Sequence, residues 1–312
     1  VSRLNDKITF VKNAIPGQKV LARIIKKKSA YFEAKKISVI NESPNAVSVR
    51  CDHFNDCGGC TFQNLDYANQ LSAKQSQIEE LFHRIGKFKN INIEPIQKCD
   101  DEFNYRNKME FTFSSMEYIP ELEKERKALD FVLGLHAPGR WDKILDIKEC
   151  HIQSLVANQI LKIIKDNSSN LTPYNIRTHS GFIRNIIIRV SENTNDIMVN
   201  IVTSRENIKL LEPVKLALVN NISRITCIIN NITSRKSGVS NAEKQILLYG
   251  NDHIIEKLGE YQFMISADSF FQTNTKQAEK LYKIILEEAS LTGKEIVYDM
   301  FCGTGSIAIY LS

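Results

Sequence analysis

The sequence predicts a multidomain α+β protein, and three stretches of its 312 residues support that prediction. Residues 1–50 hold short segments in which apolar and polar side chains alternate, which is typical of strands in a small β-barrel. Residues 51–262 mix strand and helix patterns, as a central α+β domain does. Residues 263–312 end in a strand pattern, a glycine turn and a helix start, which together open a doubly wound, Rossmann-like fold.

Length and composition limit the class of protein. A chain of 312 residues with 43% hydrophobic residues can bury the cores of two or three domains. Seven cysteines are too few for a dense disulfide framework, and we find neither a signal peptide nor a membrane-spanning apolar run, so we expect a cytoplasmic protein. The net charge of +5 permits an RNA partner without requiring one. Because the chain starts at Val1 and stops at Ser312 inside an expected helix, we expect a fragment that is truncated at both ends.

In the first 50 residues we expect strands at 19–25 and 46–50, with a turn at Pro16 and Gly17. Between the strands lies a basic run that is interleaved with aromatic side chains: Lys26, Lys27 and Lys28, then Tyr31 and Phe32, then Lys35 and Lys36. Lysines pair with phosphates and rings stack on bases, so this run is a candidate nucleic-acid surface. A solvated β-hairpin with ordinary surface lysines is the alternative.

A cysteine loop follows at residues 50–62, with the sequence R-C-D-H-F-N-D-C-G-G-C-T-F. Cys51, Cys57 and Cys60 can point at one centre only if the backbone turns back sharply, and Gly58 and Gly59 allow that turn. A [4Fe–4S] cluster and a tetrahedral zinc ion are the two natural occupants, and each needs a fourth ligand. We favour the cluster, because structural zinc sites usually bring two C-x-x-C pairs or a pair with histidines.

The fourth ligand is sought among four other cysteines. Cys150 has the best context, since I-K-E-C-H-I-Q stands between a strand pattern and a helix pattern, and Cys99 is its competitor. Cys227 lies in a buried-strand pattern, and Cys302 belongs to the glycine turn, where we expect a small buried side chain.

Apolar periodicity predicts the remaining elements. We expect helices at 65–85 (ended by Gly86), 154–165 (capped by Ser154), 207–219 (with Pro213 inside) and 275–289, paired strands at 109–113 with 130–135 and at 182–190 with 197–202, and a charged loop at 117–127.

Two groups of basic residues stand beside these strands. Arg106 and Lys108 stand in Y-R-N-K-M-E-F (105–111). They either bind a phosphate or an extruded base, or they form salt bridges at the end of a strand. Arg184 and Arg189 lie five residues apart, on opposite faces of an ideal strand, so at most one of them faces a ligand.

The C-terminal stretch is the second informative one. S-A-D-S-F-F-Q-T-N-T, beginning at Ser266, leads into the helix at 275–289, and Gly293 ends it. We expect a buried strand at 295–301 and then the turn C-G-T-G-S, where Gly303 and Gly305 let a ligand lie against the backbone. With two glycines rather than three the pattern fits a dinucleotide poorly, and S-adenosylmethionine fits it better.

Four motifs, taken together, resemble those of the RNA uracil-C5 methyltransferases, and among them those of the cluster-containing 23S ribosomal RNA branch. The motifs are the cysteine loop with the distant Cys150, Y-R-N-K-M-E-F, S-F-F-Q-T-N and Y-D-M-F-C-G-T-G-S. The resemblance covers essentially the whole chain. It implies a partial OB-like TRAM barrel at 1–50, a central iron–sulfur and RNA-binding domain at 51–262, and the start of a class I methyltransferase domain at 263–312. It also implies a monomer that acts on RNA, with ribosomal RNA favoured over transfer RNA, and no membrane partner.

The resemblance also assigns site residues. It implies a [4Fe–4S] cluster on Cys51, Cys57, Cys60 and Cys150, S-adenosylmethionine contacts from Gln272, Asp299, Phe301, Gly303, Gly305 and Ser306, and RNA contacts from Arg106, Lys108, Lys26, Lys27 and Lys28. In this family a cysteine thiolate adds to uracil C6 and a base later removes the C5 proton. We expect both groups beyond Ser312, and not Cys302, so we expect the fragment itself to be inactive. The alternatives are a non-catalytic RNA-binding iron–sulfur protein and a radical enzyme with three cluster cysteines.

Overall fold

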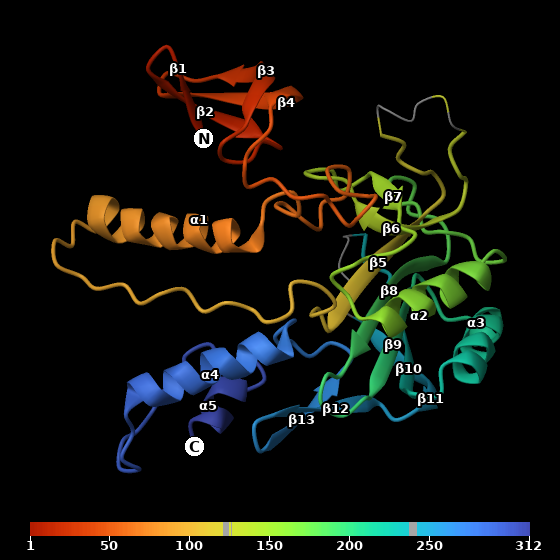
Figure 1. The fold of residues 1–312 in the computed structure, drawn as a ribbon. Coiled ribbons are helices and arrows are strands. Elements are labelled where there is room, and N and C mark those ends of the chain that lie inside the picture. The colour runs from red at the N-terminus through yellow and green to blue at the C-terminus, as the bar shows by residue number, and fades with distance from the viewer. Residues whose placement is uncertain (121–124, 126, 237–241) are drawn as a thin grey trace. The chain divides into compact units, whose positions relative to one another are not determined.

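The computed structural model describes residues 1–120, 125, 127–236 and 242–312, and it divides into two units, Val1–Asp100 and Asp101–Ser312 (Figure 1). The predicted loop at 117–127 falls partly on residues 121–124 and 126, which lie outside the described residues. Across the described part of the chain, no helix combines the length and the apolar character that crossing a membrane requires.

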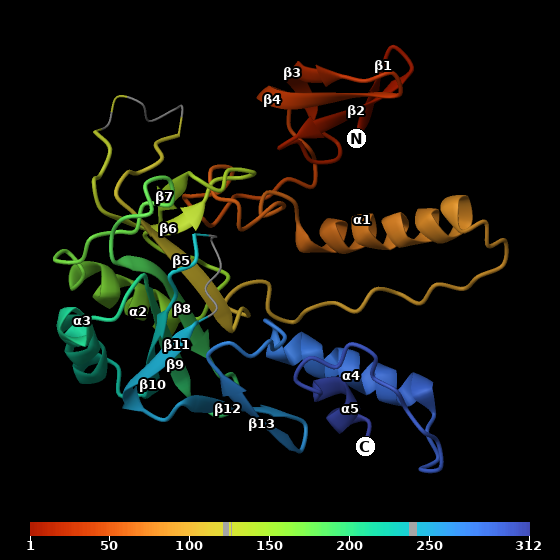
Figure 2. The ribbon, with the colours of Figure 1, turned by 180° about the vertical axis from the view of Figure 1, so that it is seen from behind.

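The first unit opens with a four-stranded sheet in the order β1-β2-β4-β3 (Figure 2). Its strands are β1 (Ser2–Leu4), β2 (Lys7–Lys12), β3 (Lys19–Lys27) and β4 (Tyr31–Asn41). The predicted strand at 19–25 is confirmed as β3, and Gly17 has a positive φ of 83° in the turn before it. The predicted strand at 46–50 is wrong, because that segment makes only one isolated bridge, Ala46 to Leu65.

The predicted helix after the cysteine loop is confirmed. It runs as α1 (Tyr67–Glu80) and then as a π-helical turn, η1 (Leu81–Ile85). Asp66 caps its start, because the carboxylate accepts a hydrogen bond of 3.0 Å from the backbone N–H of Asn69. Gly86 ends the helix with a right-handed φ of −70°, and its N–H donates to the carbonyl of Leu81 at 2.8 Å.

The second unit is built on a seven-stranded sheet in the order β11-β10-β9-β8-β5-β6-β7. Its strands are β5 (Lys108–Ser114), β6 (Val132–His136), β7 (Ile144–Asp146), β8 (Ile183–Val190), β9 (Ile197–Thr203), β10 (Ile225–Ile232) and β11 (Lys244–Gly250). The predicted pairings of β5 with β6 and of β8 with β9 are confirmed, and both are antiparallel. Only β9 and β10 run parallel in this sheet, as far as the described residues show, and a helix connects them.

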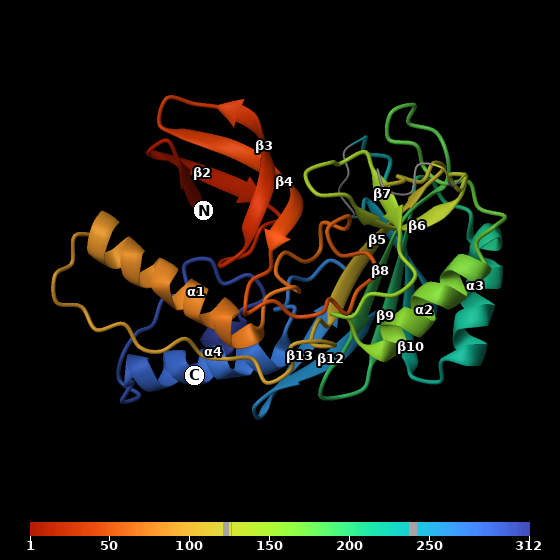
Figure 3. The same ribbon diagram turned by 45° about the horizontal axis from the view of Figure 1, so that its top comes forward.

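Two helices, α2 (Leu155–Asp166) and α3 (Ile208–Asn221), lie together on one face of this sheet (Figure 3). Both were predicted, and the buried apolar side chains Ile160, Leu161, Ile164, Leu211, Val214 and Leu218 attach them to the strands. Ser154 occupies the N-cap position of α2, but its hydroxyl makes no capping hydrogen bond. Pro213 lies inside α3, as expected.

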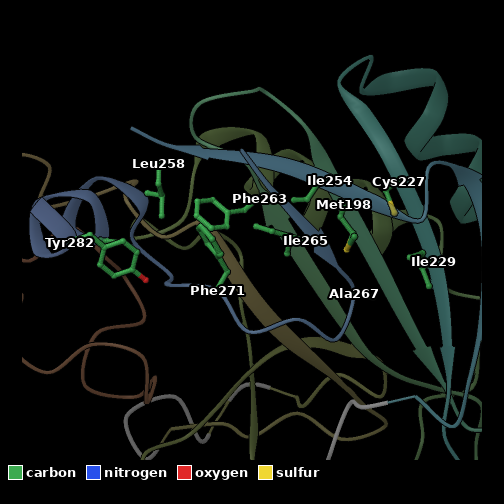
Figure 4. Packing of buried hydrophobic residues seen from close by; sticks show 11 residues of the cluster. Met198, Cys227, Ile229, Ile254, Leu258, Phe263, Ile265, Ala267, Phe271 and Tyr282 are labelled. Carbon is green, nitrogen blue, oxygen red and sulfur yellow. The ribbon is translucent and has the colours of Figure 1, made fainter. Parts of the chain in front are cut away.

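The rest of the unit continues from the sheet through the antiparallel hairpin β12 (His253–Leu258) and β13 (Tyr261–Ser266) to α4 (Thr275–Ala289) and α5 (Ser306–Tyr310). One apolar cluster joins these elements to β9 and β10 (Figure 4). Its buried members are Met198, Cys227, Ile229, Ile254, Leu258, Phe263, Ile265, Ala267, Phe271, Ala278 and Tyr282. The cluster therefore fixes the S-F-F-Q segment and α4 relative to the sheet.

The expected buried strand at 295–301 is wrong. The segment has no strand structure, and Ile296, Tyr298, Met300 and Phe301 are 79–97% exposed. A parallel strand is stable only between neighbouring strands that take up its hydrogen bonds and cover both of its faces. No strand of the described chain pairs with this segment, so its apolar pattern alone does not make it a strand.

Candidate functional site

Asn107 joins the two predicted motifs Y-R-N-K and S-F-F-Q-T-N. Its backbone N–H donates to the carbonyl of Thr273 at 2.8 Å, and its side-chain amide donates to the carbonyl of Gln272 at 2.8 Å. The same amide also donates to the hydroxyl of Thr275, at 2.9 Å. The backbone of Gln272 is therefore fixed to the start of β5.

A buried carboxylate completes this network. Glu256 in β12 is 2% exposed and accepts a hydrogen bond of 3.0 Å from the Thr275 hydroxyl. It also accepts from the hydroxyl of Ser191 and from the backbone N–H groups of Glu192, Asn193 and Lys257, at 2.9–3.1 Å. Five donors compensate for its desolvation. Through Thr275, this carboxylate orients the amide of Asn107.

The glycine turn has the backbone that the sequence predicts. Gly303 and Gly305 have left-handed φ values of 57° and 72°, and a Cβ atom added at Gly303 would meet no atom of the described residues within 4 Å. Nearby in the sequence, Asp299 has a buried Oδ2 atom for which the described residues provide no hydrogen-bond donor. An open backbone turn and an unpaired acceptor suit a ligand that carries hydroxyl donors, as the ribose of S-adenosylmethionine does.

The other predicted cofactor residues differ in their surroundings. Phe301 is 97% exposed, whereas Ser306 is buried and shares a hydrogen bond of 2.8 Å with the hydroxyl of Tyr282. Tyr282 and Phe271 belong to the same apolar cluster, so α4 links the glycine turn to the segment that carries Gln272. The six cofactor contacts themselves stay predictions. Cys302 is exposed, contrary to the expectation of a small buried side chain in this turn.

The cysteine loop carries three partly buried thiols, Cys51, Cys57 and Cys60. The pKa of Cys51 is raised, first by burial and further by the nearby Cys60, while backbone N–H groups of His53 and Phe54 oppose the rise. The N–H of Gly59 donates to the sulfur of Cys57 at 3.3 Å, as N–H groups do to cluster-bound thiolates. Over the described residues, however, no three His, Cys, Asp or Glu side chains are grouped as a metal ion requires.

Cys150, the predicted fourth ligand, is buried in the second unit. Asn158 of α2 holds its backbone at both polar atoms, since the Cys150 N–H donates to the Asn158 side-chain oxygen at 2.9 Å and the Asn158 amide donates back to the Cys150 carbonyl at 3.1 Å. Its competitor, Cys99, belongs to the first unit, where its N–H donates to the Tyr67 hydroxyl at 2.8 Å. Cys227 is in the core, as predicted, and burial raises its pKa to about 12.

The predicted RNA-binding residues lie on both units. Lys26 and Lys27 end β3 and Lys28 follows in the turn; all three are exposed, and Lys26 pairs with Glu33 at 3.6 Å. In the second unit, the Arg106 Nε donates to the carbonyl of Lys108 at 3.0 Å. Burial and the neighbouring Arg189 lower the pKa of Lys108. The structure thus groups Lys108 with Arg189, which the sequence did not indicate.

Asn107 and Glu256 are the two site residues that sequence analysis missed. Asn107 stands inside a motif whose evident feature is its charges, and Glu256 stands in H-I-I-E-K-L, a pattern that predicts an ordinary strand. The one sequence feature that indicates a buried role for Glu256 is its position among the inward-facing residues of the hairpin. Its partners lie between 1 and 65 residues away along the chain, so local patterns could not identify them.

Comparisons with known proteins identify the family. No protein-family model matches the chain. It is 38% identical over 304 residues to an uncharacterized RNA methyltransferase of Chlorobaculum tepidum, with 95% of this chain and 63% of that protein covered. It is 33% identical to one of Porphyromonas gingivalis (99% and 69% covered) and 34% identical to one of Bacteroides thetaiotaomicron (100% and 70%). The chain thus spans about two thirds of the length of these relatives.

A solved structure agrees with these relatives. The crystal structure of Pyrococcus abyssi tRNA (uracil-54, C5)-methyltransferase in complex with S-adenosyl-L-homocysteine matches with a TM-score of 0.72 and 26% identity, over 96% of this chain and 65% of that one. The mixed α/β fold is therefore similar to that of a uracil-C5 methyltransferase. With relatives above 30% identity matched over more than two thirds of their length, the chain belongs to the RNA methyltransferase family.

Proposed function

We propose that the full-length protein is an S-adenosylmethionine-dependent RNA uracil-C5 methyltransferase that acts on 23S-type ribosomal RNA. The observation that carries the proposal is the likeness to the Pyrococcus abyssi enzyme, which extends over 96% of this chain. The choice of ribosomal RNA rests on the cysteine pattern at 51–60, which resembles the cluster-containing branch of the family. The target uridine has to leave its stack to reach a methyl donor.

We propose that Gln272, Asp299, Phe301, Gly303, Gly305 and Ser306 bind S-adenosylmethionine. The cofactor supplies an electrophilic methyl group when it is bound. The contribution of the chain is to hold the binding groups: Asn107 fixes the backbone of Gln272, and the left-handed glycines leave the turn open. We expect the nucleophilic cysteine and the general base outside residues 1–312, and we assign neither role to Cys302.

We further propose a structural [4Fe–4S] cluster on Cys51, Cys57, Cys60 and Cys150. Support comes from the spacing of the three cysteines in the loop, which resembles the cluster-containing branch, and from the N–H donor to the Cys57 sulfur. Zinc is the other possible occupant. Iron, sulfide and zinc analysis of anaerobically purified protein distinguishes the two.

The domain assignment is part of the same proposal: a TRAM-like barrel at 1–50, an iron–sulfur and RNA-binding domain at 51–262 and the start of the methyltransferase domain at 263–312. Lys26, Lys27, Lys28, Arg106 and Lys108 would supply RNA contacts. We also propose a monomer in the cytoplasm.

The test uses the full-length protein with S-adenosylmethionine that carries a labelled methyl group. Ribosomal and transfer RNA transcripts are offered separately, and the products are digested to nucleosides and analysed by mass spectrometry. We expect 5-methyluridine in the 23S-type transcript. Methylation of transfer RNA alone would refute the substrate assignment, and a labelled base other than uridine would refute the reaction. RNA binding with no transfer to either RNA would instead favour a non-catalytic RNA-binding protein.

A further inference from the structure

Two cations face each other across strands β5 and β8. Lys108 and Arg189 are direct partners in this antiparallel pair, so their side chains project from the same face of the sheet. Like charges in this position repel each other, and after burial, which is the larger cause, this repulsion lowers the pKa of Lys108. The carboxylates of Glu110 and Asp268 act in the opposite direction and raise the pKa of Lys108. Asp268 already accepts hydrogen bonds from Asn231 and Gln245, each at 3.0 Å.

Some hydrogen-bond donors of Arg189 have no acceptor among the described residues. The residue is 3% exposed, and its Nη2 donates to the carbonyl of Ser269 at 2.7 Å. Its Nε and Nη1 atoms are buried, and the described residues offer them no acceptor. Burial lowers the pKa of Arg189 to about 10, so the side chain keeps its charge at neutral pH. Buried donors without partners are rare in folded proteins, so these two point to a ligand.

Arg184, on the same strand, provides a contrast. Its Nη1 donates to the carbonyls of Thr233 and Arg235 at 3.0 and 2.7 Å, and its guanidinium stacks 4.2 Å from the ring centre of Tyr174. These are structural contacts within the second unit. Of the two arginines on this strand, Arg189 is therefore the one whose buried donors find no acceptor among the described residues.

The position of Arg189 indicates which kind of ligand it binds. Ser269, its present acceptor, directly precedes Phe270, Phe271 and Gln272, and Asn107 holds Gln272 beside Lys108. The cation pair thus borders the segment that carries a proposed cofactor contact. Residues 267–274 lie between β13 and α4 without regular structure, and the carbonyl of Ser269 in this segment contacts the guanidinium of Arg189.

We propose that Lys108 and Arg189 together bind one phosphodiester group of the RNA substrate, adjacent to the nucleotide presented at the S-F-F-Q segment. This inference rests on the proposed function and specifies where the RNA backbone lies. A phosphate provides oxygens for Nε and Nη1 of Arg189, which find no acceptor among the described residues, and neutralises the like charges. The carboxylate of S-adenosylmethionine offers similar chemistry, and the experiment separates these two sources.

The test measures binding of a short fluorescein-labelled oligouridylate to the full-length protein by anisotropy at several salt concentrations. We expect Lys108→Met and Arg189→Met each to weaken binding about tenfold, as loss of a charge-assisted contact does. Because both cations hold one phosphate, the double variant lowers the slope of log K against log salt by about 0.7, the value of one contact on a single strand. Lys209→Met, an exposed charge on α3, serves as the control and leaves the slope unchanged.

Three results would overturn the inference. One is a folded Arg189→Met variant with the affinity and slope of the wild type. The second is a loss of S-adenosylhomocysteine affinity by calorimetry with no change in the RNA slope, because the anion would then be the cofactor carboxylate. If Arg189→Met does not fold, the half-exposed Lys108→Met decides alone, and an unchanged slope in that variant is the third. Wild-type protein that binds no RNA contradicts the proposed function instead.

Discussion

The side-chain amide of Asn107 donates a hydrogen bond of 2.8 Å to the backbone carbonyl of Gln272, 165 residues further along the chain. The bond connects the residue that directly precedes β5 to the segment between β13 and α4. Asn107 therefore has a structural role, whereas the sequence indicates only that it belongs to a basic motif.

Replacing Asn107 with alanine removes two side-chain hydrogen bonds, to Gln272 and Thr275. We expect a loss of about 1–3 kcal/mol in the free energy of unfolding and about tenfold weaker binding of S-adenosylhomocysteine, because Gln272 is no longer held. Calorimetry on the full-length protein measures the binding. Asn221→Ala, which removes one exposed hydrogen bond at the end of α3, is the control. Equal affinity in both variants would contradict a positioning role.

Replacing Glu256 with glutamine puts an amide where a carboxylate accepts from five donors. One amide oxygen cannot satisfy them all, so buried N–H groups lose their acceptor. We expect a loss of about 2–4 kcal/mol in the free energy of unfolding, measured by urea denaturation. Glu260→Gln, at an exposed position in the neighbouring turn, should change stability little. A stable Glu256→Gln variant would show that the network is dispensable.

The fourth cluster ligand is tested by comparing Cys150→Ser with Cys99→Ser. We expect Cys150→Ser to lose the visible absorption and the bound iron of the anaerobically purified protein, because a serine hydroxyl is a poor ligand for the cluster. Cys99→Ser should retain both. The reverse result would identify Cys99 as the ligand, and iron retained in both variants would point to a three-cysteine site.

Thiol labelling distinguishes the two cysteines of the second unit that lie outside the proposed cluster. Cys302 is exposed, whereas Cys227 is fully buried and burial raises its pKa to about 12. We expect iodoacetamide at about pH 8 to modify Cys302 in the native protein and Cys227 only after unfolding, because the thiolate is the reactive form. Mass spectrometry of peptides from native and urea-treated protein reads out both sites. Rapid native labelling of Cys227 would contradict its place in the core.

The cap of α1 makes that helix sensitive to acid. Hydrogen bonds from the backbone and the side chain of Asn69 lower the pKa of Asp66 below its ordinary value of 3.8. The carboxylate therefore contributes its full stabilisation above pH 3.8, and that contribution is lost as the pH falls through the lowered pKa. We expect circular dichroism to show helix loss in this acid range, and Asp66→Asn to lack this pH-dependent component. Identical acid titrations for both proteins would refute the role of the cap.

The sequence predicted the regular elements whose patterns are local. The helices at 154–165, 207–219 and 275–289 and the strand pairs of the central sheet follow from apolar periodicity, which records the face that each element buries. The segment at 295–301 has the same apolar character and forms no strand, because a strand also needs partners to pair with. The segment at 46–50 likewise makes a single bridge.

What the sequence by itself determined is the set of motifs: the three clustered cysteines, the S-F-F-Q segment and the two-glycine turn, each made of neighbouring residues. Only the tertiary structure decided that Asn107 holds Gln272, that Glu256 anchors Thr275, and that Nε and Nη1 of Arg189 are left without an acceptor in the part of the chain that is described. The physical reason is that hydrogen bonding and desolvation depend on which groups meet in space. These partners come from strands and turns far apart in the sequence, where no local pattern records the contact.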